Sequence, residues 1–164
     1  MAGAVKLEIR PLEPTDDVTS FACGDGDIDG FLKEDAARLH QQGVVTVYLG
    51  FQDARLAGYV ALLADCINVN SHERRKLMLE HRDHPTIPAV KVARIGTCTD
   101  LQGKGIGVAL LRVAADKALV ISEEVGCRLL TLDAYPSRVE YYEKRGFVRN
   151  KAGSQGCGKS LAMP

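Results

Sequence analysis

Alternation between apolar and polar residues marks the first elements of the chain. Every second residue is apolar over residues 5–9, which predicts a half-buried strand. Apolar residues then recur at helical spacing over residues 28–39, with Asp27 or Asp29 available as the N-cap and Gly43 as the stop. The chain is therefore expected to begin with a strand and an amphipathic helix.

Two longer apolar runs follow this helix. Residues 44–51 and 56–63 flank a polar turn at residues 52–54, which predicts a hairpin of two antiparallel strands. Asn70 and Glu73 have the three-residue spacing of a capping box, so a charged helix is expected to start there and to continue through residue 79.

A strand, a helix and a second strand form the central part of the pattern. The strands are expected over residues 90–99 and 127–132. Gly126 stops the helix between them, whose apolar face is expected to be Val108, Leu111, Ala115, Ala118 and Leu119. Because a helix joins the two strands in a βαβ crossover, the strands are expected to be parallel.

The last segments complete an α+β pattern. Pro136 suits the first turn of a short helix that ends at Arg145, with Gly146 as its C-cap, and residues 147–149 and 159–163 are expected to be closing strands. A chain of 164 residues is long enough for one domain that buries about 70% of its unfolded surface. A single domain over residues 1–164 is therefore expected.

Composition limits the possible binding partners and the cellular location of the protein. Lysine plus arginine and aspartate plus glutamate number 21 each, so no overall charge attracts nucleic acid or a membrane. The five cysteines include no C-x-x-C pair, which argues against a disulfide framework and a zinc site. Charged residues interrupt the apolar N-terminus, and no apolar run approaches transmembrane length. A cytoplasmic protein with no membrane partner is expected.

Two motifs match the sequence patterns of known binding sites but lack a structural feature that each site requires. Residues 153–160 match the P-loop pattern, but too few residues follow Ser160 to form the helix that directs its N-terminus at the phosphates. Residues 25–30 resemble the start of a calcium loop, but Ala36 occupies the position of the required bidentate glutamate. Neither nucleotide binding there nor a metal site is expected.

A glycine-punctuated loop at residues 102–107 precedes the central helix. Backbone N–H groups in such a turn lack internal acceptors, so the loop can bind an anion. The loop is not a dinucleotide fingerprint, because Val108 occupies the position of the third glycine. It is not a P-loop either, because Gly105 follows Lys104 where serine or threonine must hold magnesium.

Two segments together resemble the GNAT superfamily of N-acetyltransferases. Gln102, Gly105 and Gly107 match its Q/R-x-x-G-x-G/A pyrophosphate loop, and residues 141–147, YYEKRGF, match its Y-E-K-x-G-F helix ending. The resemblance covers nearly the whole chain and implies a GNAT-type mixed, mainly antiparallel central sheet flanked by helices. It also implies that acetyl-CoA, as the cosubstrate, lies in a cleft between two splayed parallel strands.

The resemblance further implies a set of contacts with acetyl-CoA. Main-chain groups would meet the pantetheine arm and the thioester at Ile95, Gly96 and Thr97. The pyrophosphate would be surrounded by Gln102, Gly103, Lys104, Gly105, Ile106, Gly107 and Val108, and Ser137 would also contact CoA. Tyr142 would protonate the departing thiolate, since an ordinary tyrosine pKa of about 10 keeps the proton in place at neutral pH. Its neighbour Tyr141 is expected to pack in the interior.

The expected reaction is direct transfer of the acetyl group to a primary amine in a ternary complex. No residue stands out as the general base, and Glu73, Glu80 and a water relay are alternatives. An α-amine with a pKa of about 7.7 to 8 needs less deprotonation than a lysine amine at about 10.4. The family resemblance also implies a homodimer.

The N-terminal half is similar to the branch of the superfamily that contains toxins acetylating aminoacyl-tRNA. The residues that carry this similarity are Phe21, Ala22, Cys23, Gly24, Ile28, Asp29, Gly30, Phe31, Leu32, Ala36, Gly43, Ala57, Gly58 and Tyr59. The alternative is therefore a toxin that acetylates the α-amine of aminoacyl-tRNA and pairs with a cognate antitoxin.

Such a toxin needs basic surface for the tRNA backbone. The candidate residues are Arg74, Arg75, Lys76, Arg138, Lys144, Arg145, Arg149 and Lys151. The balanced net charge of the chain argues against this alternative. A second alternative is a non-catalytic acyl-CoA-binding module that keeps the glycine loop without turnover, and the presence of Tyr142 argues against it.

Overall fold

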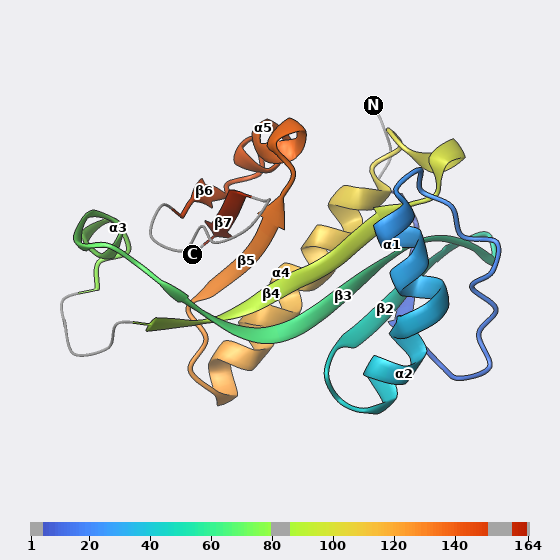
Figure 1. Cartoon of the computed structure of the whole chain (residues 1–164), viewed down its shortest axis with the longest axis horizontal. Coiled ribbons are helices and arrows are strands. Elements are labelled where there is room, and N and C mark those ends of the chain that lie inside the picture. The colour runs from blue at the N-terminus through green and yellow to red at the C-terminus, as the bar shows by residue number, and fades with distance from the viewer. Residues whose placement is uncertain (1–4, 80–85, 151–158, 164) are drawn as a thin grey trace. The chain divides into compact units, whose positions relative to one another are not determined.

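The computed structural model describes residues 5–79, 86–150 and 159–163. Hydrogen bonds join its strands in the order β1-β2-β3-β4-β5-β7-β6 (Figure 1). Among the strand pairs whose register is described, β4 with β5 is parallel and the other four are antiparallel. The prediction of an α+β fold with a mixed, mainly antiparallel sheet is confirmed.

The chain divides into two compact units. The first comprises Met1–Leu63 and Ala93–Ala114, and the second comprises Ala64–Val92 and Ala115–Pro164. Strands β3 and β4 and helix α4 each contribute residues to both units. The boundary between the units therefore runs through these three elements.

An antiparallel ladder starts the first unit. Its strands are β1 (Glu8–Pro11), β2 (Thr46–Gln52) and β3 (Arg55–Asn68). Asp53 and Ala54 connect β2 to β3 with φ angles of 50° and 64°, as a two-residue type I′ turn requires. The hairpin prediction is confirmed. The first strand begins at Glu8 rather than residue 5, because its ladder with β2 starts at the pair Glu8 and Phe51.

The predicted first helix consists of three consecutive helical segments. They are α1 (Gly26–Gly30), the π-helical turn η1 (Phe31–Asp35) and α2 (Ala36–Gln41). The N-cap is Asp25, whose carboxylate accepts a hydrogen bond from the N–H of Asp27 at 2.9 Å. The prediction of Asp27 or Asp29 as the cap was wrong. Asp29 instead accepts from the N–H of Cys23 at 2.8 Å, which ties the preceding loop to the helix.

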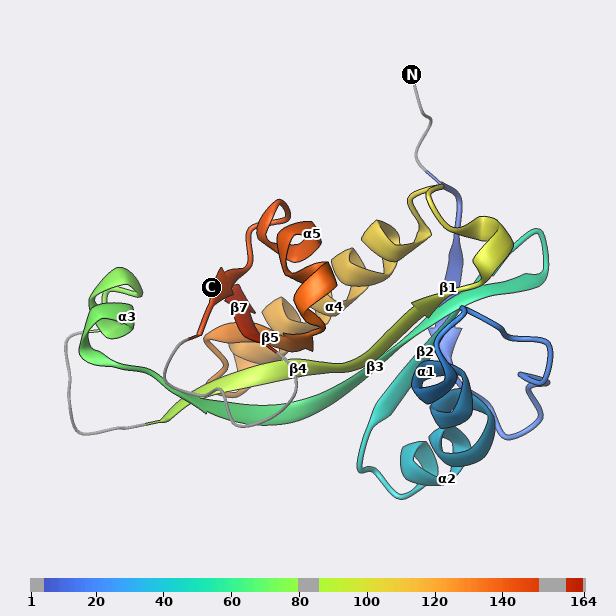
Figure 2. The same ribbon diagram turned by 45° about the horizontal axis from the view of Figure 1, so that its top comes forward.

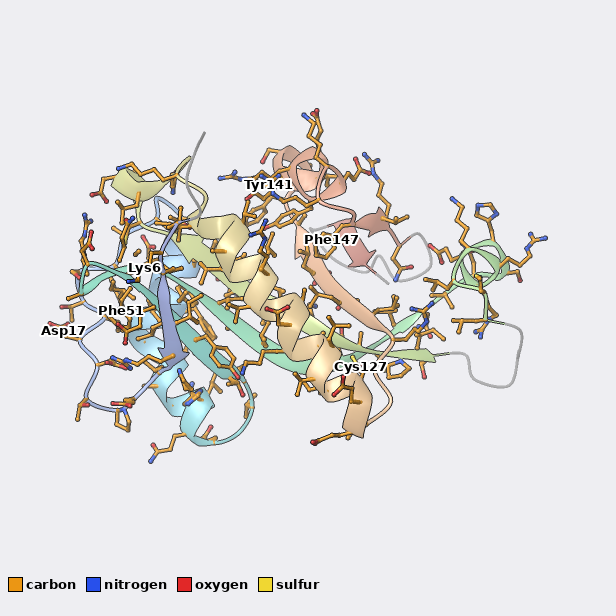
Figure 3. All side chains as sticks on the ribbon, turned by 180° about the vertical axis from the view of Figure 1, so that it is seen from behind. Lys6, Asp17, Phe51, Cys127, Tyr141 and Phe147 are labelled. Carbon is orange, nitrogen blue, oxygen red and sulfur yellow. The ribbon has the colours of Figure 1, made fainter. Side chains whose placement is uncertain are left out.

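Helices cover both faces of the strands in the first unit. α1 and α2 lie on one face, and the first half of α4 (Ile106–Glu124) lies on the other (Figure 1, Figure 3). The α4 half buries Ile106, Leu110, Leu111 and Ala114. Phe21 and Tyr59 are fully buried and pack edge to face, with ring centroids 5.2 Å apart. This core supports the last residues of β4, on which the candidate site is built.

The second unit combines parallel and antiparallel strands. β4 (Thr86–Thr97) pairs with β5 (Leu129–Ala134) over Ala89 to Val92 and Leu129 to Leu132. β5 pairs with β7 (Lys159–Met163), which pairs with β6 (Val148–Arg149). After η3 (Pro136–Arg138), helix α5 (Val139–Glu143) lies beside β7 (Figure 2). The predicted parallel pair and closing strands are confirmed. The P-loop-like letters lead into strand β7, not into a helix, and residues 151–158 lie outside the described residues.

Helix α3 (Ser71–Lys76) has the predicted capping box. Asn70 Oδ1 accepts from the N–H of Glu73 at 2.8 Å, and Glu73 Oε2 accepts from the N–H of Asn70 at 2.9 Å. The helix ends at Lys76, three residues earlier than expected, and Met78 follows with a left-handed φ of 56°. The change of direction lets Leu77 and Leu79 pack against the buried residues Ile67, Ile87, Ala89 and Leu129.

The second half of α4 is exposed. Leu119, Val120 and Ile121 have relative exposures of 64%, 57% and 41%. The prediction that Leu119 is buried was therefore wrong. Helical periodicity identifies the apolar side of a helix, but it does not tell how far along the helix the covering surface extends.

Candidate active site

The glycine loop of the first unit is anchored at its entry. β4 continues into the 3-10 turn η2 (Thr99–Leu101), and the N–H of Cys98 donates to the carbonyl of Ala57 at 2.8 Å. The N–H and the hydroxyl of Thr99 both donate to the carbonyl of Ala22, at 2.9 and 3.0 Å. These bonds connect the loop to β3 and to the segment before α1.

The Gln102 side chain stabilises the loop through hydrogen bonds to two backbone carbonyls. Its Nε2 donates to the carbonyls of Cys23 at 2.8 Å and Thr97 at 3.1 Å, and its backbone N–H donates to Thr99 at 3.4 Å. The sequence pattern associated Gln102 with the pyrophosphate. In the structure, the amide of Gln102 holds the loop in its conformation.

Two glycines shape the loop that leads into α4. Gly103 and Gly105 have φ angles of 77° and 86°, a region that other residues adopt at a cost. α4 then begins at Ile106, whose side chain is buried in the core. The backbone N–H groups of the first helical turn, which includes Gly107 and Val108, have no intrahelical acceptors and lie at the positive end of the helix dipole. The loop and the helix start are therefore suited to bind an anion through main-chain donors.

The end of β4 provides a strip of half-buried backbone next to this loop. The strip consists of Ile95, Gly96 and Thr97. A Cβ at Gly96 would lie 2.7 Å from Cγ2 of Ile28 and 3.1 Å from Cζ of Phe21. Only glycine lets α1 approach the strand this closely, so the glycine fixes the position of the strip.

Arg94 precedes this strip and was not singled out by the sequence analysis. Its Nε lies 3.0 Å from Oδ2 of Asp27, and its guanidinium lies 5.5 Å from the ring centroid of Phe31. Phe31 stacks on Tyr59 with centroids 6.2 Å apart, and the Tyr59 hydroxyl donates to the carbonyl of Ile28 at 2.7 Å. Burial raises the pKa of Tyr59, so this hydroxyl stays protonated. The sequence did contain a signal for Arg94, because it is the one charged residue among the apolar residues and glycine of positions 92–96.

In the second unit, Tyr142 lies half-buried on α5. Its ring makes edge contacts with Tyr141 and Phe147, at centroid distances of 5.1 and 5.8 Å. Burial, and next the neighbouring Tyr141, raise the pKa of the Tyr142 hydroxyl, while Arg138 and Arg145 act in the opposite direction. The balance keeps the hydroxyl protonated and able to donate a proton.

Tyr141 supports two arginines. The Arg145 guanidinium lies 3.4 Å from the Tyr141 ring centroid, and its Nη1 donates to the Tyr141 carbonyl at 2.7 Å. Arg138 lies 5.9 Å from the same centroid. Ser137 is exposed on η3, in the same unit. Tyr141 was predicted to pack in the interior. Its ring is instead half-buried, and the Arg145 guanidinium covers its face.

The remaining predictions concern the two candidate general bases, metal ligands and membrane-spanning helices. Glu73 closes the capping box of α3, and Glu80 lies outside the described residues. Within residues 5–79, 86–150 and 159–163, no three or more His, Cys, Asp or Glu side chains cluster as metal ligands would. None of the described helices combines the length and apolar character needed to cross a membrane.

Comparisons with known families and proteins agree on one class. The sequence model of the acetyltransferase (GNAT) domain matches residues 43–149. A tRNA-acetylating toxin of Mycobacterium tuberculosis is 26% identical over 125 residues, which cover 76% of this chain and 74% of that protein. The probable toxin TacT of Sinorhizobium fredii is 28% identical, over 88% of this chain and 86% of that protein.

Solved structures share the fold. AtaT complexed with acetyl-methionyl-tRNAfMet superposes with a TM-score of 0.83 at 23% identity, over 97% of this chain and 95% of that chain. A tyrosine-to-phenylalanine variant of KacT superposes with a TM-score of 0.81 at 23% identity, over 96% of this chain and 94% of that chain. At this identity the similarity establishes the fold alone.

Proposed function

The chain belongs to the GNAT family of acetyltransferases, and from this premise we propose that it transfers an acetyl group from acetyl-CoA to the α-amine of an aminoacyl-tRNA. It is an N-acetyltransferase, and acetyl-CoA is its cosubstrate. The proposal treats residues 1–164 as one acetyltransferase domain and makes the protein the toxin of a toxin–antitoxin pair.

The observation that carries the proposal is the agreement between two kinds of similarity. The curated relatives from two bacteria are named as a tRNA-acetylating toxin and a probable toxin. The structural neighbours include AtaT with an acetylated aminoacyl-tRNA and AtaT bound to the C-terminus of its antitoxin AtaR. These relatives support aminoacyl-tRNA more than an unrelated small amine as the acceptor of this chain.

The donor half of the proposed site uses the main chain of the first unit. Ile95, Gly96 and Thr97 follow the last residue of β4 that pairs with β5, Val92, and we assign their backbone groups to the pantetheine arm and the thioester. We assign the N–H groups of the loop and of the first turn of α4 to the pyrophosphate. Each such hydrogen bond to a charged phosphate contributes about 1.5 to 3 kcal/mol.

The proposed transfer is a direct attack of the amine on the thioester carbonyl. A new C–N bond forms, a main-chain N–H within residues 95–97 stabilises the oxyanion, and the C–S bond then breaks. Tyr142 donates its proton to the departing sulfur, and the amine releases one proton to solvent or to a base. Ser137 is assigned a contact with CoA.

The acceptor amine itself favours this chemistry. An α-amine with a pKa of about 7.7 to 8 is unprotonated in a useful fraction at neutral pH, whereas a lysine amine at about 10.4 is almost wholly protonated. An α-amine therefore reacts without a strong general base. The proposal also places the protein in the cytoplasm, where charged tRNA is found, and includes a homodimer and a cognate antitoxin as partners.

The test is a transfer assay with labelled acetyl-CoA and a panel of acceptors. The panel contains aminoacyl-tRNA, uncharged tRNA, peptides with a free α-amine and polyamines. The proposal expects acetyl transfer to aminoacyl-tRNA and none to uncharged tRNA. Transfer to polyamines or peptides alone would refute the acceptor, and absence of transfer to every amine would refute the enzyme activity.

Expression in growing cells provides an independent test of the toxin role. Wild-type protein is expected to arrest growth, and the Tyr142→Phe variant, expressed at the same level, is expected to permit it. Tyr141→Phe is the matched control, because it removes a neighbouring hydroxyl and keeps the ring that contacts Arg145. Arrest by both variants would disconnect toxicity from acetyl transfer.

A further inference from the structure

The cations around α5 differ in whether a carboxylate neutralises them. Lys144 Nζ lies 2.8 Å from Glu140 Oε1, and Arg149 Nε lies 2.7 Å from Glu143 Oε1. Arg138 and Arg145 have no carboxylate partner among the described residues. Two positive charges on this segment are therefore left for an external anion.

One of these arginines, Arg145, is held on the Tyr141 ring, and the other, Arg138, lies near the same ring with an exposed side chain. The Arg145 guanidinium covers Tyr141 at 3.4 Å and is fixed by its hydrogen bond to the Tyr141 carbonyl, while Arg138 lies 5.9 Å from the ring centroid. Their charges act on the Tyr142 hydroxyl. A guanidinium held by stacking loses less conformational freedom when it binds a phosphate than a free side chain does.

We propose that Arg145, stacked on Tyr141, and the nearby Arg138 bind phosphates of the 3′-terminal nucleotides of the acceptor tRNA. The inference rests on the proposed function, because it names the part of aminoacyl-tRNA that meets the segment around Tyr142. Guanidinium groups suit this role, since they bind phosphate oxygens with paired donors. The single-stranded 3′ end offers phosphates and unstacked bases to such a surface.

Chemical connectivity favours the acceptor over CoA as the source of these phosphates. The entire pantetheine arm separates the phosphates of CoA from the thioester sulfur that Tyr142 is proposed to protonate. In aminoacyl-tRNA, only the aminoacyl ester and the terminal ribose separate the reacting amine from the first backbone phosphate. The proposal therefore assigns the cations of this segment to the tRNA phosphates.

The test compares two double variants that remove the same charge from the same segment. R138Q/R145Q removes the two arginines that have no carboxylate partner in the described part of the chain, and K144Q/R149Q removes the two neutralised cations. Equilibrium binding of tRNA is measured by fluorescence anisotropy over a range of salt concentrations, and binding of acetyl-CoA is measured by calorimetry.

R138Q/R145Q is expected to bind tRNA about tenfold more weakly, with acetyl-CoA affinity unchanged. The dependence of log affinity on log salt is expected to fall in slope by about 1.4, since each contact with a single-strand phosphate contributes about 0.7. K144Q/R149Q is expected to stay within about twofold of the wild type. Equal losses in the two double variants would indicate a general field effect and would overturn the proposal.

A second arm separates tRNA from CoA as the phosphate source. Wild type and R138Q/R145Q are each tested with acetyl-CoA and with its 3′-dephospho form. Weaker acetyl-CoA binding in the variant, together with no remaining preference for the 3′-phosphate, would assign the arginines to CoA and overturn the proposal. The single variant R138Q, which changes an exposed side chain, gives the same comparison if R145Q disturbs the end of α5.

Failure of this inference is distinguishable from failure of the proposed function. If wild type acetylates aminoacyl-tRNA and R138Q/R145Q binds tRNA normally, the proposed function stands and the arginine assignment fails. If wild type transfers no acetyl group to aminoacyl-tRNA, the proposed function fails before the variants are compared.

Discussion

The two compact units each position a different functional feature, and they do so by different physical means. In the first unit, tight packing fixes main-chain groups: a Cβ at Gly58 would lie 2.7 Å from the Gly96 carbonyl oxygen and 2.9 Å from Cδ1 of Leu110. In the second unit, Tyr142 is half-buried beside two arginines that lack a carboxylate partner among the described residues. A backbone cradle depends on close packing, whereas a proton donor depends on its electrostatic surroundings. Damage to the first unit should therefore change acetyl-CoA affinity, and damage to the second should change turnover.

The largest effect is expected at the backbone cradle. Gly105→Glu forces a non-glycine residue to a φ of 86°, at about 1 to 2 kcal/mol, and places a negative charge beside the pyrophosphate. With phosphate hydrogen bonds of about 1.5 to 3 kcal/mol also lost, acetyl-CoA affinity should fall by more than about 100-fold, as calorimetry would measure. Gly126→Glu is the matched control, since a Cβ there meets no atom within 4 Å. Unchanged affinity in Gly105→Glu would refute the cradle.

The second largest effect is expected at Tyr142, the proposed proton donor. Tyr142→Phe removes the hydroxyl and keeps the ring contacts with Tyr141 and Phe147. Steady-state assays should show kcat lower by about 10² to 10⁴-fold, the usual contribution of general acid catalysis, with acetyl-CoA affinity unchanged. Tyr141→Phe should retain near wild-type kcat. A loss confined to affinity would assign Tyr142 to binding instead of proton transfer.

The pH profile sharpens the same assignment. Because burial raises the pKa of Tyr142 above its ordinary value of about 10, the hydroxyl keeps its proton throughout the neutral and mildly alkaline range. With an α-amine acceptor, kcat/KM should rise through about pH 7.7 to 8 as the amine loses its proton. At saturating substrates, kcat should show no decline at any pH lower than about 10. A decline centred near pH 8 would contradict Tyr142 as the proton donor.

A smaller effect distinguishes the two halves of α4. Leu110 is fully buried in the first unit, whereas Leu119 is 64% exposed in the second. Leu110→Ala should lower the free energy of unfolding by about 3 kcal/mol, because it leaves a cavity, and Leu119→Ala should lower it by less than about 0.5 kcal/mol. Urea denaturation measures both. Equal losses would mean that the second half of the helix is covered in solution.

The smallest effect concerns a neutralised charge in the first unit. Asp16 accepts from Arg10 at 2.6 and 2.9 Å and from the N–H of Glu13 at 2.7 Å, and its side chain is 12% exposed. Asp16→Asn should destabilise the fold by about 1 kcal/mol while leaving acetyl-CoA affinity unchanged.

The effect of Asp16 on stability should depend on pH. Arg10 holds the pKa of Asp16 below its ordinary value, so its stabilisation is complete above the unfolded-state pKa of about 3.9 and is lost as pH falls through the lower folded-state pKa. Thermal unfolding from pH 7 to pH 2 should thus show wild type and Asp16→Asn converging at low pH. A constant difference would mean that Asp16 contributes through its shape alone.

Features that depend on neighbouring residues were predictable from sequence. The hairpin turn at Asp53 and Ala54 and the capping box of Asn70 and Glu73 were found where the pattern indicated them. The parallel pairing of β4 with β5 followed from the helix between them. Each depends on a few adjacent side chains or on a single helix that connects two strands.

Features that depend on distant contacts were not predictable. The cap is Asp25 rather than Asp27 or Asp29, because Asp29 is used to hold the loop at Cys23. The end of α3 follows from packing of Leu79, which its own periodicity does not reveal. Arg94 became part of the site description only when the fold brought Asp27 and Phe31 to it.

By itself, the sequence determined the family and, through the family, acetyl-CoA as the cosubstrate. Gly105 and Gly107 before a long amphipathic helix, followed one βα unit later by Tyr142, define that pattern. Tertiary structure decided that the Gln102 amide turns inward to Cys23 and Thr97, and that Arg145 is stacked on Tyr141 without a carboxylate partner among the described residues. The reason is physical: spacing along the chain sets local conformation, whereas partners for polar and charged groups are chosen by distances that exist only after folding.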